Sequence, residues 1–380
     1  MIALTSASFL TFANLYFVQP ILPLFVKEFS ITSTTASLSL SLSVVAMIVG
    51  LLFFGFLSDR MGRVSVMIVT LICSILPLLV MPMVSSFTVL LILRFIQGFF
   101  IAGLPAAAIA YISEELAPKS VGLGITFYIA ANGFGGMGGR VLIGYLADST
   151  SWRMAVYVLF AVGVVLCLLF ILYLPKSTYF ERSTITIKED LQGMFIHVKN
   201  PVLIPVFSMG IMLQLAFTGI WTYLPFYLEM EPFFLSIKDV SFTYFAYFTG
   251  VIGSMVAGRF VDHIPKSTLI ISGIITLIIG AFLTKFASLT IIVIGLSILC
   301  LGFFVTHSVV AALVNELATH HKGGASSLYL VSYYIGVATG GTASGLVWTE
   351  YGWTGVTMIS LFLIPVMVWV RVTRQKIPVK

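Results

Sequence analysis

Ionisable side chains are rare inside the apolar stretches of this sequence, so those that occur there are the first candidates for chemistry. Arg94 and Arg140 each interrupt a long apolar run. If such a run crosses a membrane, an arginine near its middle costs at least about 2.5–3.5 kcal/mol and must face a cavity or a partner group. Two roles therefore stay open for Arg94: it lines a polar cavity, or it caps backbone carbonyl groups.

A histidine and a glutamate are candidates for proton transfer. His307 is the only histidine well inside an apolar run, and Glu316 follows near the end of the same run. The reference pKa of histidine, about 6.5, suits a proton carrier. A hydrogen-bonded histidine that does not titrate is the more common alternative. We expect His307 or Glu316 to take part in proton coupling.

A glycine-rich stretch around residues 132–148 matches the G-x-G-x-x-G fingerprint of a dinucleotide site by its spacing alone. That fingerprint needs a preceding strand and an acidic residue about 20 positions further on, whereas this stretch lies inside a long apolar segment. Small residues at i and i+4 instead let transmembrane helices pack backbone to backbone. The glycines expected to form such packing surfaces are Gly135, Gly136, Gly139, Gly144, Gly336, Gly340, Gly341 and Gly345.

The composition indicates which solvent surrounds these residues. Hydrophobic residues make up 59% of the 380 and charged residues 9%, with a mean hydropathy of +1.10. A soluble domain carries roughly 25% charged residues, so the chain is predicted to be a multi-pass membrane protein. The net charge of +6 forms no basic patch that would indicate nucleic acid. The three cysteines lie far apart and predict neither a disulfide framework nor a metal site, and we expect no cofactor.

The apolar stretches predict an all-α membrane protein with twelve transmembrane helices in two six-helix bundles. A span needs about 20 apolar residues to cross the hydrocarbon core. The stretches that qualify are roughly 2–26, 33–57, 64–84, 86–113, 120–147, 152–174, 201–228, 239–261, 267–285, 288–315, 323–348 and 353–372. The expected domains are an N-terminal bundle at 1–174, a cytoplasmic linker at 175–200 and a C-terminal bundle at 201–380.

Lysine and arginine placement predicts the orientation of these spans. With the N-terminus in the cytoplasm, 14 of the 20 basic residues fall in inner loops and the tail, four in outer loops and two within spans. Basic residues concentrate on the cytoplasmic side of membrane proteins. Both termini are therefore expected in the cytoplasm, with the protein in a bacterial-type plasma (inner) membrane.

The two halves of the sequence also resemble each other. Tyr128, Gly144 and Trp152 recur as Tyr329, Gly345 and Trp353 at an offset of 201, and Asp59 and Arg63 recur as Asp262 and Lys266 at an offset of 203. Several matches near one offset indicate a duplicated six-span unit. Transporters built from such repeats bind substrate in a polar cavity where the repeats meet.

Two motifs carry a family resemblance. The stretch GFLSDRMGR, Gly55 to Arg63, resembles the G-x-L-a-D-r-x-G-r-k motif of the major facilitator superfamily, and Arg94, Gln97 and Gly98 fit its R-x-x-q-G motif. The segments AYISEELAP, YIAANGFGGMGGR, SWR and ASSLYLVSYYIG resemble the YnfM-like (acriflavin-sensitivity) branch. That branch is similar to drug–proton antiporters.

The resemblance implies a gate at the inner face. Gly55 would let its helix end approach a neighbour closely, and Gly62 would permit a tight turn. Glu114 and Glu115 sit where the family often pairs an acid with the Asp59–Arg63 turn, although a solvated helix end is an equal alternative. The expected gating residues are Gly55, Asp59, Arg60, Gly62, Arg63, Glu114, Glu115, Asp262 and Lys266.

The polar and aromatic residues within spans predict a substrate cavity. Aromatic rings bind amphipathic molecules by stacking and apolar contact. The candidate cavity residues are Asn14, Gln19, Arg94, Gln97, Asn132, Arg140, Gln214, Trp221, Tyr223, Tyr329 and Tyr333. The lack of a buried acid favours a neutral, zwitterionic or anionic substrate, whereas the branch name points to a cationic dye.

We therefore expect a monomeric secondary active transporter that works by alternating access and exports a small amphipathic molecule in exchange for protons. A proton symporter that imports a metabolite on the same fold is the first alternative. A membrane-embedded enzyme is disfavoured because no His, Asp, Glu or Cys cluster has catalytic or ligand spacing. A primary pump is disfavoured because the sequence has no G-x-x-x-x-G-K-[ST] phosphate loop.

Overall fold

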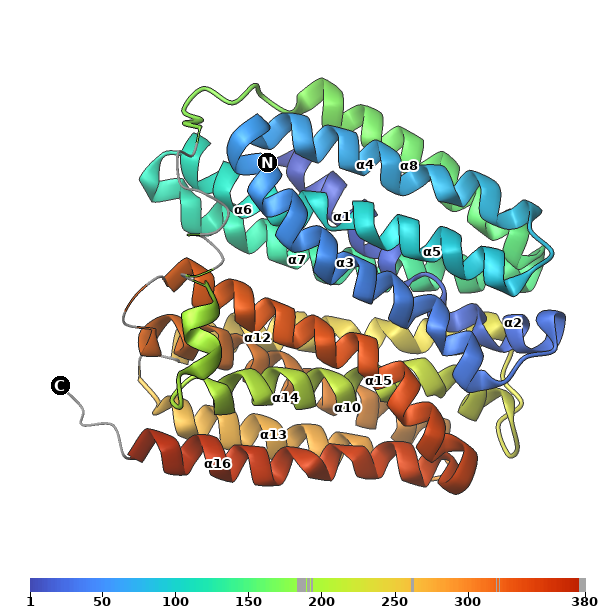
Figure 1. Cartoon of the computed structure of the whole chain (residues 1–380). Helices are drawn as coiled ribbons and strands as arrows, with labels where there is room; N and C mark the ends of the chain where they lie inside the picture. The colour runs from blue at the N-terminus through green and yellow to red at the C-terminus, as the bar shows by residue number, and fades with distance from the viewer. Residues whose placement is uncertain are drawn as a thin grey trace. The chain divides into compact units, whose positions relative to one another are not determined.

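The structure is a computed structural model of the chain, and it describes residues 1–182, 189, 192, 194–260, 263–318, 320 and 322–375. Every regular element of this described part is a helix (Figure 1). Because backbone groups in a bilayer must find their hydrogen-bond partners within the chain, helices are the expected solution for so apolar a sequence.

The helices follow the apolar stretches closely. In the first part of the chain they are α1 (Ile2–Tyr16), η1 (Gln19–Ile21), α2 (Leu22–Phe29), α3 (Ser33–Met61), α4 (Arg63–Val80), η2 (Met81–Met83), α5 (Phe87–Ile101), α6 (Gly103–Glu115), α7 (Pro118–Ser149) and α8 (Trp152–Tyr173). They continue with η3 (Ile196–Lys199), α10 (Ile204–Glu229), α11 (Ile237–Phe242), η4 (Thr243–Ala246), α12 (Tyr247–Phe260), α13 (Lys266–Leu283), α14 (Leu289–Leu317), α15 (Lys322–Met358), η5 (Ile359–Phe362) and α16 (Leu363–Gln375).

Nine helices of the described part are both long and apolar enough to cross a membrane. The longest candidate, Gly323–Val372, has 50 residues and is broken at Gly352, which has φ 55° and ψ −146°. It therefore contains the last two predicted spans. The fifth predicted span corresponds to α7, and the eighth corresponds to α11, η4 and α12, which lie outside the nine. The total of twelve stays a prediction.

The chain forms two compact units. Unit 1 comprises Met1–Thr184, Leu228–Met230 and Phe234–Tyr244, and unit 2 comprises Ile185–Tyr227, Glu231–Phe233 and Phe245–Lys380. Helix α11 groups with unit 1, because it packs against α7. The predicted domain bounds stay a prediction.

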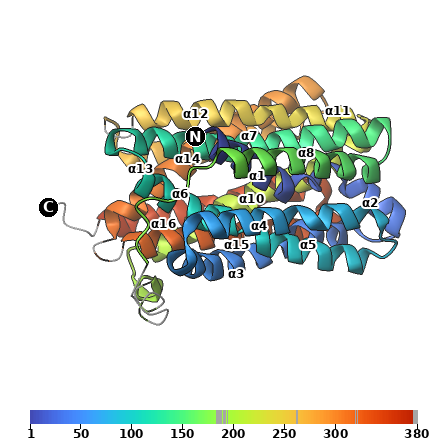
Figure 2. The same cartoon turned by 90° about the horizontal axis from the view of Figure 1, so that it is seen from above.

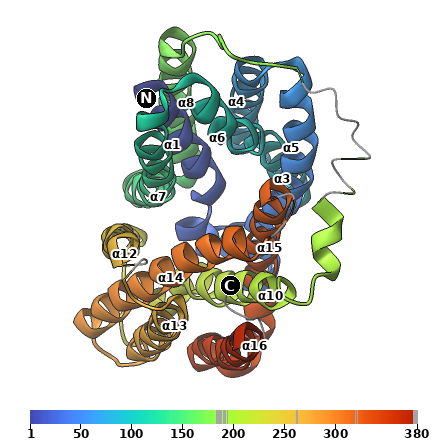
Figure 3. The ribbon, with the colours of Figure 1, turned by 90° about the vertical axis from the view of Figure 1, so that its left-hand side faces the viewer.

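Glycines allow the closest helix contacts in each unit. In unit 1, α1 lies beside α7 (Figure 3), and a Cβ added at Gly135 or Gly139 would overlap Phe9 or Ala13. The corresponding pair in unit 2 is α10 and α15, where Gly336 and Gly340 lie equally close to Ile211 and Leu215. The glycines are related by an offset of 201 (336 − 135, 340 − 139) and their partners by 202 (211 − 9, 215 − 13).

A second helix crossing repeats with its residues exchanged. In unit 1, Gly103 of α6 packs against the side chain of Thr70 of α4. In unit 2, the glycine is Gly273 of α13 and the threonine is Thr306 of α14. Both positions shift by 203 (273 − 70, 306 − 103). Each crossing thus has one glycine and one threonine, which supports an origin of the two halves by duplication.

Candidate functional site

Arg94 on α5 is fully buried and is held by oxygen atoms from three helices. It is 0% exposed. Its Nε donates to the carbonyl of Ser39 (2.9 Å), and its Nη2 donates to the carbonyl of Leu15 (2.7 Å). Its Nη1 donates to the carbonyl of Asn14 (2.9 Å) and to Oε1 of Gln97 (2.5 Å). The sequence left two roles open for Arg94, and this geometry matches the second, in which Arg94 caps backbone carbonyl groups.

The surroundings of Arg94 extend this role to a fourth helix. Gln97 donates from Nε2 to the carbonyl of Ser74 on α4 (3.2 Å), and α4 runs beside α5 (Figure 2). Ser43 on α3 donates to the carbonyl of Arg94 (2.7 Å), at a point where Gly98 lets the backbones approach. Buried charges persist when they are fully hydrogen-bonded. Arg94 and Gln97 thus fix the positions of α1, α3, α4 and α5.

Arg140 on α7 has a different environment. The residue is 2% exposed, and its guanidinium carbon lies 4.3 Å from the ring centre of Tyr16 and 5.1 Å from that of Tyr244. Its Nε donates to Oε1 of Gln19 (2.6 Å), and its Nη1 donates to the carbonyl of Gly136 (2.9 Å). A cation between two aromatic faces is stabilised by their quadrupoles. We call these five residues the arginine clamp.

The clamp lies where α11 packs on α7. One turn beyond Arg140, a Cβ at Gly144 would overlap the hydroxyl of Ser241 on α11. Lys238 places its ammonium group 5.3 Å from the ring centre of Tyr145. Within the same unit, Lys27 pairs with Glu229 at 3.0 Å, but Lys27 is 70% exposed, so this ion pair contributes little stability.

A charge cluster forms where α3 turns into α4. Gly62 has a φ of 100°, a conformation that favours glycine, and the turn places Arg63 at the start of α4. Arg63 donates from Nη1 to Asp59 and to the hydroxyl of Ser58 (3.0 Å). Its Nη2 and Nε donate to Oε1 of Glu114 on α6, at 2.8 and 3.2 Å. We call Asp59, Arg63 and Glu114 the inner charge cluster.

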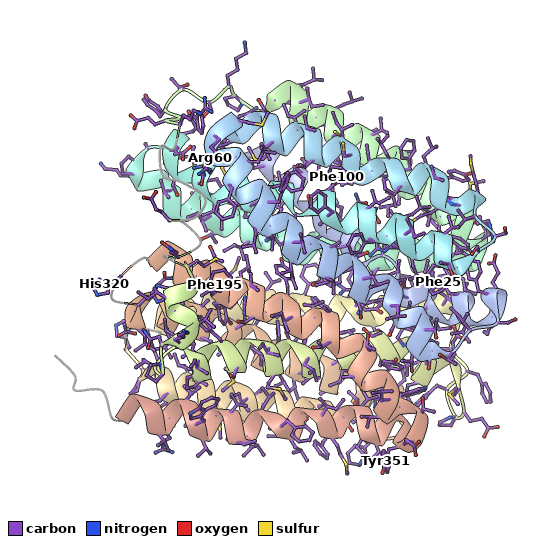
Figure 4. All side chains as sticks on the ribbon, in the orientation of Figure 1. Phe25, Arg60, Phe100, Phe195, His320 and Tyr351 are labelled. Atoms are coloured by element: carbon purple, nitrogen blue, oxygen red, sulfur yellow. The ribbon has the colours of Figure 1, made fainter. Side chains whose placement is uncertain are left out.

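Two gating residues differ from their sequence-based interpretation. Among the described residues, no atom outside its own stretch of helix lies within 4 Å of the place where a Cβ of Gly55 would sit, so the described part shows no close approach there. Glu115 does not join the inner charge cluster. Arg60, labelled in Figure 4, donates from Nη1 to the carbonyl of Phe56 (3.0 Å).

Glu115 instead holds the beginning of the linker. Its Oε1 accepts from the hydroxyl of Ser177 (2.6 Å) and from the backbone amides of Thr178 (2.7 Å) and Tyr179 (3.0 Å). Tyr111, one turn earlier on α6, donates to the carbonyl of Pro175 (2.9 Å). We call this contact the linker dock.

The linker dock adjoins the inner charge cluster. The ring of Phe180 lies 5.9 Å from the guanidinium carbon of Arg63. Glu114 and Glu115 are consecutive on α6, and they contact Arg63 and the linker respectively. The two neighbouring carboxylates therefore connect the start of α4 and the start of the linker to the same helix end.

Unit 2 has its own ion pair at the corresponding place. Lys266 at the start of α13 pairs with Glu316 near the end of α14, at 2.7 Å. These residues follow Arg63 by 203 (266 − 63) and Glu114 by 202 (316 − 114). The remaining predicted member, Asp262, lies outside the described residues. Glu316, considered above for proton coupling, thus has the place that Glu114 has in unit 1.

A cluster of aromatic rings lies between α10, α12 and α14 in unit 2. The rings of Phe217 and Phe303 stack at a centroid distance of 3.8 Å. Trp221 lies 4.8 Å from Tyr247 and 6.1 Å from Phe217. Phe303 stacks in turn on His307, one turn further along α14, with an angle of 7° between the planes. We call these rings, together with Tyr329 and Tyr333, the aromatic cluster.

His307 connects the aromatic cluster to α15. Its Nδ1 shares a hydrogen bond of 2.9 Å with the hydroxyl of Tyr329, and its ring centre lies 4.8 Å from that of Tyr333. Tyr329 also contacts Gly210 of α10 closely. The structure thus brings three predicted residues together, and His307 is part of a hydrogen-bonded pair.

Within the described residues, the side chains of four other predicted cavity residues take no part in the contacts given above. Asn132 accepts a hydrogen bond from Ser8. Tyr223 lies 5.5 Å from the ring of Trp348. The side-chain amide atoms of Asn14 and the Oε1 of Gln214 are buried, at 0% and 2% residue exposure, and have no hydrogen-bond partner in the described part. A buried polar atom without a partner is costly, so these two amides are available to a bound molecule or water.

Sequence reasoning missed the groups that complete these arrangements. Tyr16 and Phe303 carry no sequence signal beyond their aromatic character, and neither do Tyr111 and Phe180. The offset of the repeat could have indicated the Lys266–Glu316 pair, because Glu316 aligns with Glu114. Within the described residues no group of three or more His, Cys, Asp or Glu side chains could hold a metal ion.

These features define the class of protein to which the chain belongs. Helices long and apolar enough to span a bilayer, in two units with repeated packing and repeated ion pairs, are those of a multi-pass membrane protein of the transporter type. The family model of the Major Facilitator Superfamily matches residues 4–248 and 230–380. The chain belongs to this superfamily.

Named relatives and solved structures agree with this assignment. The chain is 38% identical to the inner membrane transport protein YnfM of Escherichia coli, over 98% of this chain and 90% of YnfM. It is 33% identical to the uncharacterised MFS-type transporter YybF of Bacillus subtilis, over 97% of this chain and 91% of YybF. A bacterial homologue of the human lysosomal transporter Spinster, solved in an inward-facing and unoccupied conformation, superposes with a TM-score of 0.81 at 14% identity, over 98% of this chain and 96% of that one.

Proposed function

We propose that this protein is a secondary active transporter that works by alternating access and exports a small amphipathic molecule in exchange for protons. Both termini lie in the cytoplasm in this proposal, and one chain is the working unit. The observation that carries it is the repeated ion pair, Arg63–Glu114 in unit 1 and Lys266–Glu316 in unit 2. A transporter needs an element with two arrangements of similar free energy, and partly exposed ion pairs at equivalent helix ends are suited to break and form again.

The aromatic cluster is the proposed binding surface for the apolar part of the substrate. Several of its rings lie nearly parallel to one another, an arrangement that a planar aromatic substrate can extend by stacking. The unpartnered Oε1 of Gln214 supplies an acceptor for a donor on the substrate. For unit 1, taken by itself, Arg94 is engaged with backbone carbonyls, so Arg140 of the arginine clamp is the buried arginine that we propose for polar contacts.

His307 is the proposed proton carrier. Its hydrogen bond to Tyr329 and its contact with Tyr333 join it to the proposed substrate surface. A proton on His307 therefore changes the charge of that surface and the affinity for substrate. Glu316 is better suited to the gate than to proton transfer, because Lys266 pairs with it.

Substrate identity is tested first by thermal stability. The purified protein is heated with planar aromatic cations, zwitterions and anions, and with sugars as non-planar controls. Ligand at 100 times its Kd stabilises by about 2.7 kcal/mol, which raises the melting temperature measurably. A matched pair of variants tests the site, since Tyr329→Phe and the exposed Tyr145→Phe each lose only a hydroxyl. We expect the first to lower the shift given by the best ligand and the second to leave it unchanged.

Direction and coupling are tested in cells and proteoliposomes. Export predicts that an uncoupler raises accumulation of the substrate in expressing cells, whereas a symporter that imports it predicts a fall. In proteoliposomes, His307→Gln is expected to retain substrate exchange and lose transport driven by a pH gradient. Full gradient-driven transport by His307→Gln contradicts its proposed role as the proton carrier.

A further inference from the structure

We propose that a groove between α13 and α16 binds an anionic phospholipid. Ile270 and Ile271 of α13, Leu313 of α14, and Met367 and Val370 of α16 line the groove. All five side chains are apolar, and the two flanking helices lie side by side (Figures 1 and 3). The groove is shallow, with room inside for little more than one water molecule, so a hydrocarbon chain would lie along its apolar surface.

One end of the groove is basic. Arg371 and Ser267 complete its lining. Arg371 follows Met367 by one helical turn, and Lys266 precedes Ile270 by one turn, so both cations lie at the helix ends beyond the apolar lining. Within the described ranges Arg371 has neither an ion-pair nor a hydrogen-bond partner.

These features favour a phospholipid over other occupants. The apolar residues that flank the groove, such as Val368 and Trp369 of α16 and Ile275 of α13, are 46–50% exposed, which in a membrane protein means contact with lipid. Basic pockets between transmembrane helices bind anionic headgroups. The sequence continues the positive charge beyond Arg371 with Arg374, Lys376 and Lys380. The nearby cations and the apolar lining together match a negatively charged headgroup whose acyl chain lies along the groove.

The site connects the lipid to the ion pair of unit 2. Lys266, which pairs with Glu316 at 2.7 Å, is also the residue before Ser267 of the groove. A phosphate bound at this end competes with Glu316 for the ammonium group. Anionic lipid is therefore expected to loosen the Lys266–Glu316 pair. Binding itself depends only on the placement of the chain in a membrane and not on the proposed transport reaction.

The groove has a natural control at the other end of α13. There Ile279, Phe282, Leu283 and Phe286 form an apolar hollow with Lys285 beside it. The ammonium group of Lys285 lies 5.5 Å from the ring centre of Phe282. A generic attraction of lipid to an apolar surface with one cation applies at least as strongly to this larger hollow. If binding of the anionic lipid is specific, only a substitution at the Arg371 groove weakens it.

The test is lipid binding to the purified full-length protein, measured by native mass spectrometry during titration with phosphatidylglycerol or phosphatidylcholine. We expect saturable binding of phosphatidylglycerol to the wild type, about fivefold weaker binding to Arg371→Ala, and unchanged binding to Lys285→Ala. Arg371→Lys keeps the charge and is expected to restore most of the affinity. Equal binding of both lipids, or equal losses in Arg371→Ala and Lys285→Ala, overturns the proposal. The melting temperature of each variant without lipid verifies folding.

Discussion

At the scale of single residues, the two buried arginines have different roles although the sequence presents them alike. Arg94 donates to the carbonyls of three residues and to an amide. Arg140 lies between two aromatic rings and bonds to Gln19. Rigid carbonyl partners make a structural site, whereas rings and a side-chain amide can rearrange. The arginine clamp is therefore the better place for a contact that changes during transport.

The structural role of Arg94 predicts a large loss of stability on conservative substitution. Arg94→Lys keeps the charge but cannot reach all the acceptors, and each buried acceptor left unpaired costs about 1–3 kcal/mol. We expect a loss of about 3 kcal/mol or more, measured by thermal or denaturant unfolding in detergent. Arg153→Lys is the control, because Arg153 also donates to carbonyls but is 36% exposed. If the Arg94→Lys protein is stable but no longer binds substrate, Arg94 lines the substrate cavity and its role is not structural.

At the scale of elements, the end of α6 organises the neighbouring segments. Its two consecutive glutamates bond to different partners, the start of α4 and the start of the linker. A carboxylate that accepts backbone amides forms a charge-assisted hydrogen bond, which is stronger than a neutral one. The linker dock is thus a specific contact, and it places Phe180 beside Arg63.

The linker dock predicts a local change in hydrogen exchange. Glu115→Ala removes the acceptor of the Thr178 and Tyr179 amides, and these solvent-exposed hydrogen bonds contribute about 0.5–1.5 kcal/mol. Exchange of these two amides, followed by mass spectrometry, should rise roughly twofold to tenfold. Glu115→Gln, which retains an acceptor oxygen, should give a smaller rise, and Glu181→Ala none. Unchanged exchange in Glu115→Ala would show that the dock does not persist in solution.

At the scale of the whole molecule, each unit has an equivalent ion pair and equivalent glycine contacts. Such internal repetition is what a transporter with two homologous halves requires. The inner charge cluster is partly exposed, with 12% exposure for the Arg63 side chain and 27% for that of Glu114. Its contribution to the free energy of unfolding is therefore small, and its larger effect is expected on the equilibrium between conformations.

This distinction predicts separate effects on transport and stability. Glu114→Gln should lower the transport rate severalfold while changing the free energy of unfolding by about 1 kcal/mol or less. Glu229→Gln is the matched control, since it removes a carboxylate from the Lys27 pair, whose lysine is 70% exposed. Transport rate in proteoliposomes and unfolding in detergent are measured on the same preparations. If the loss of stability accounts for the whole loss of transport, the inner charge cluster has a structural role and not a gating role.

The sequence predicted the membrane class, the family and the Arg63 turn because these depend on composition and on short spacings. It also named His307 for proton coupling and Tyr329 and Tyr333 for the substrate cavity, although without their contacts with one another. It could not decide the role of Arg94, because residue types do not indicate which backbone carbonyl groups of other helices lie nearby. The linker partners of Glu115 and the rings around Arg140 were missed for the same reason, since they come from segments distant in sequence.

Gly103 packs on Thr70 in unit 1, and Gly273 packs on Thr306 in unit 2, with glycine and threonine exchanged between the two helices. This exchange limits the ways in which the two halves can have diverged. If both descend from one ancestral sequence, two substitutions separate the copies, either both in one copy or one in each. Two threonines would have collided, because even a Cβ at either glycine overlaps the opposing side chain. Two glycines would only have left a void, at a tolerable cost. The evolutionary path therefore ran through a loosened junction of paired glycines, which a threonine later filled.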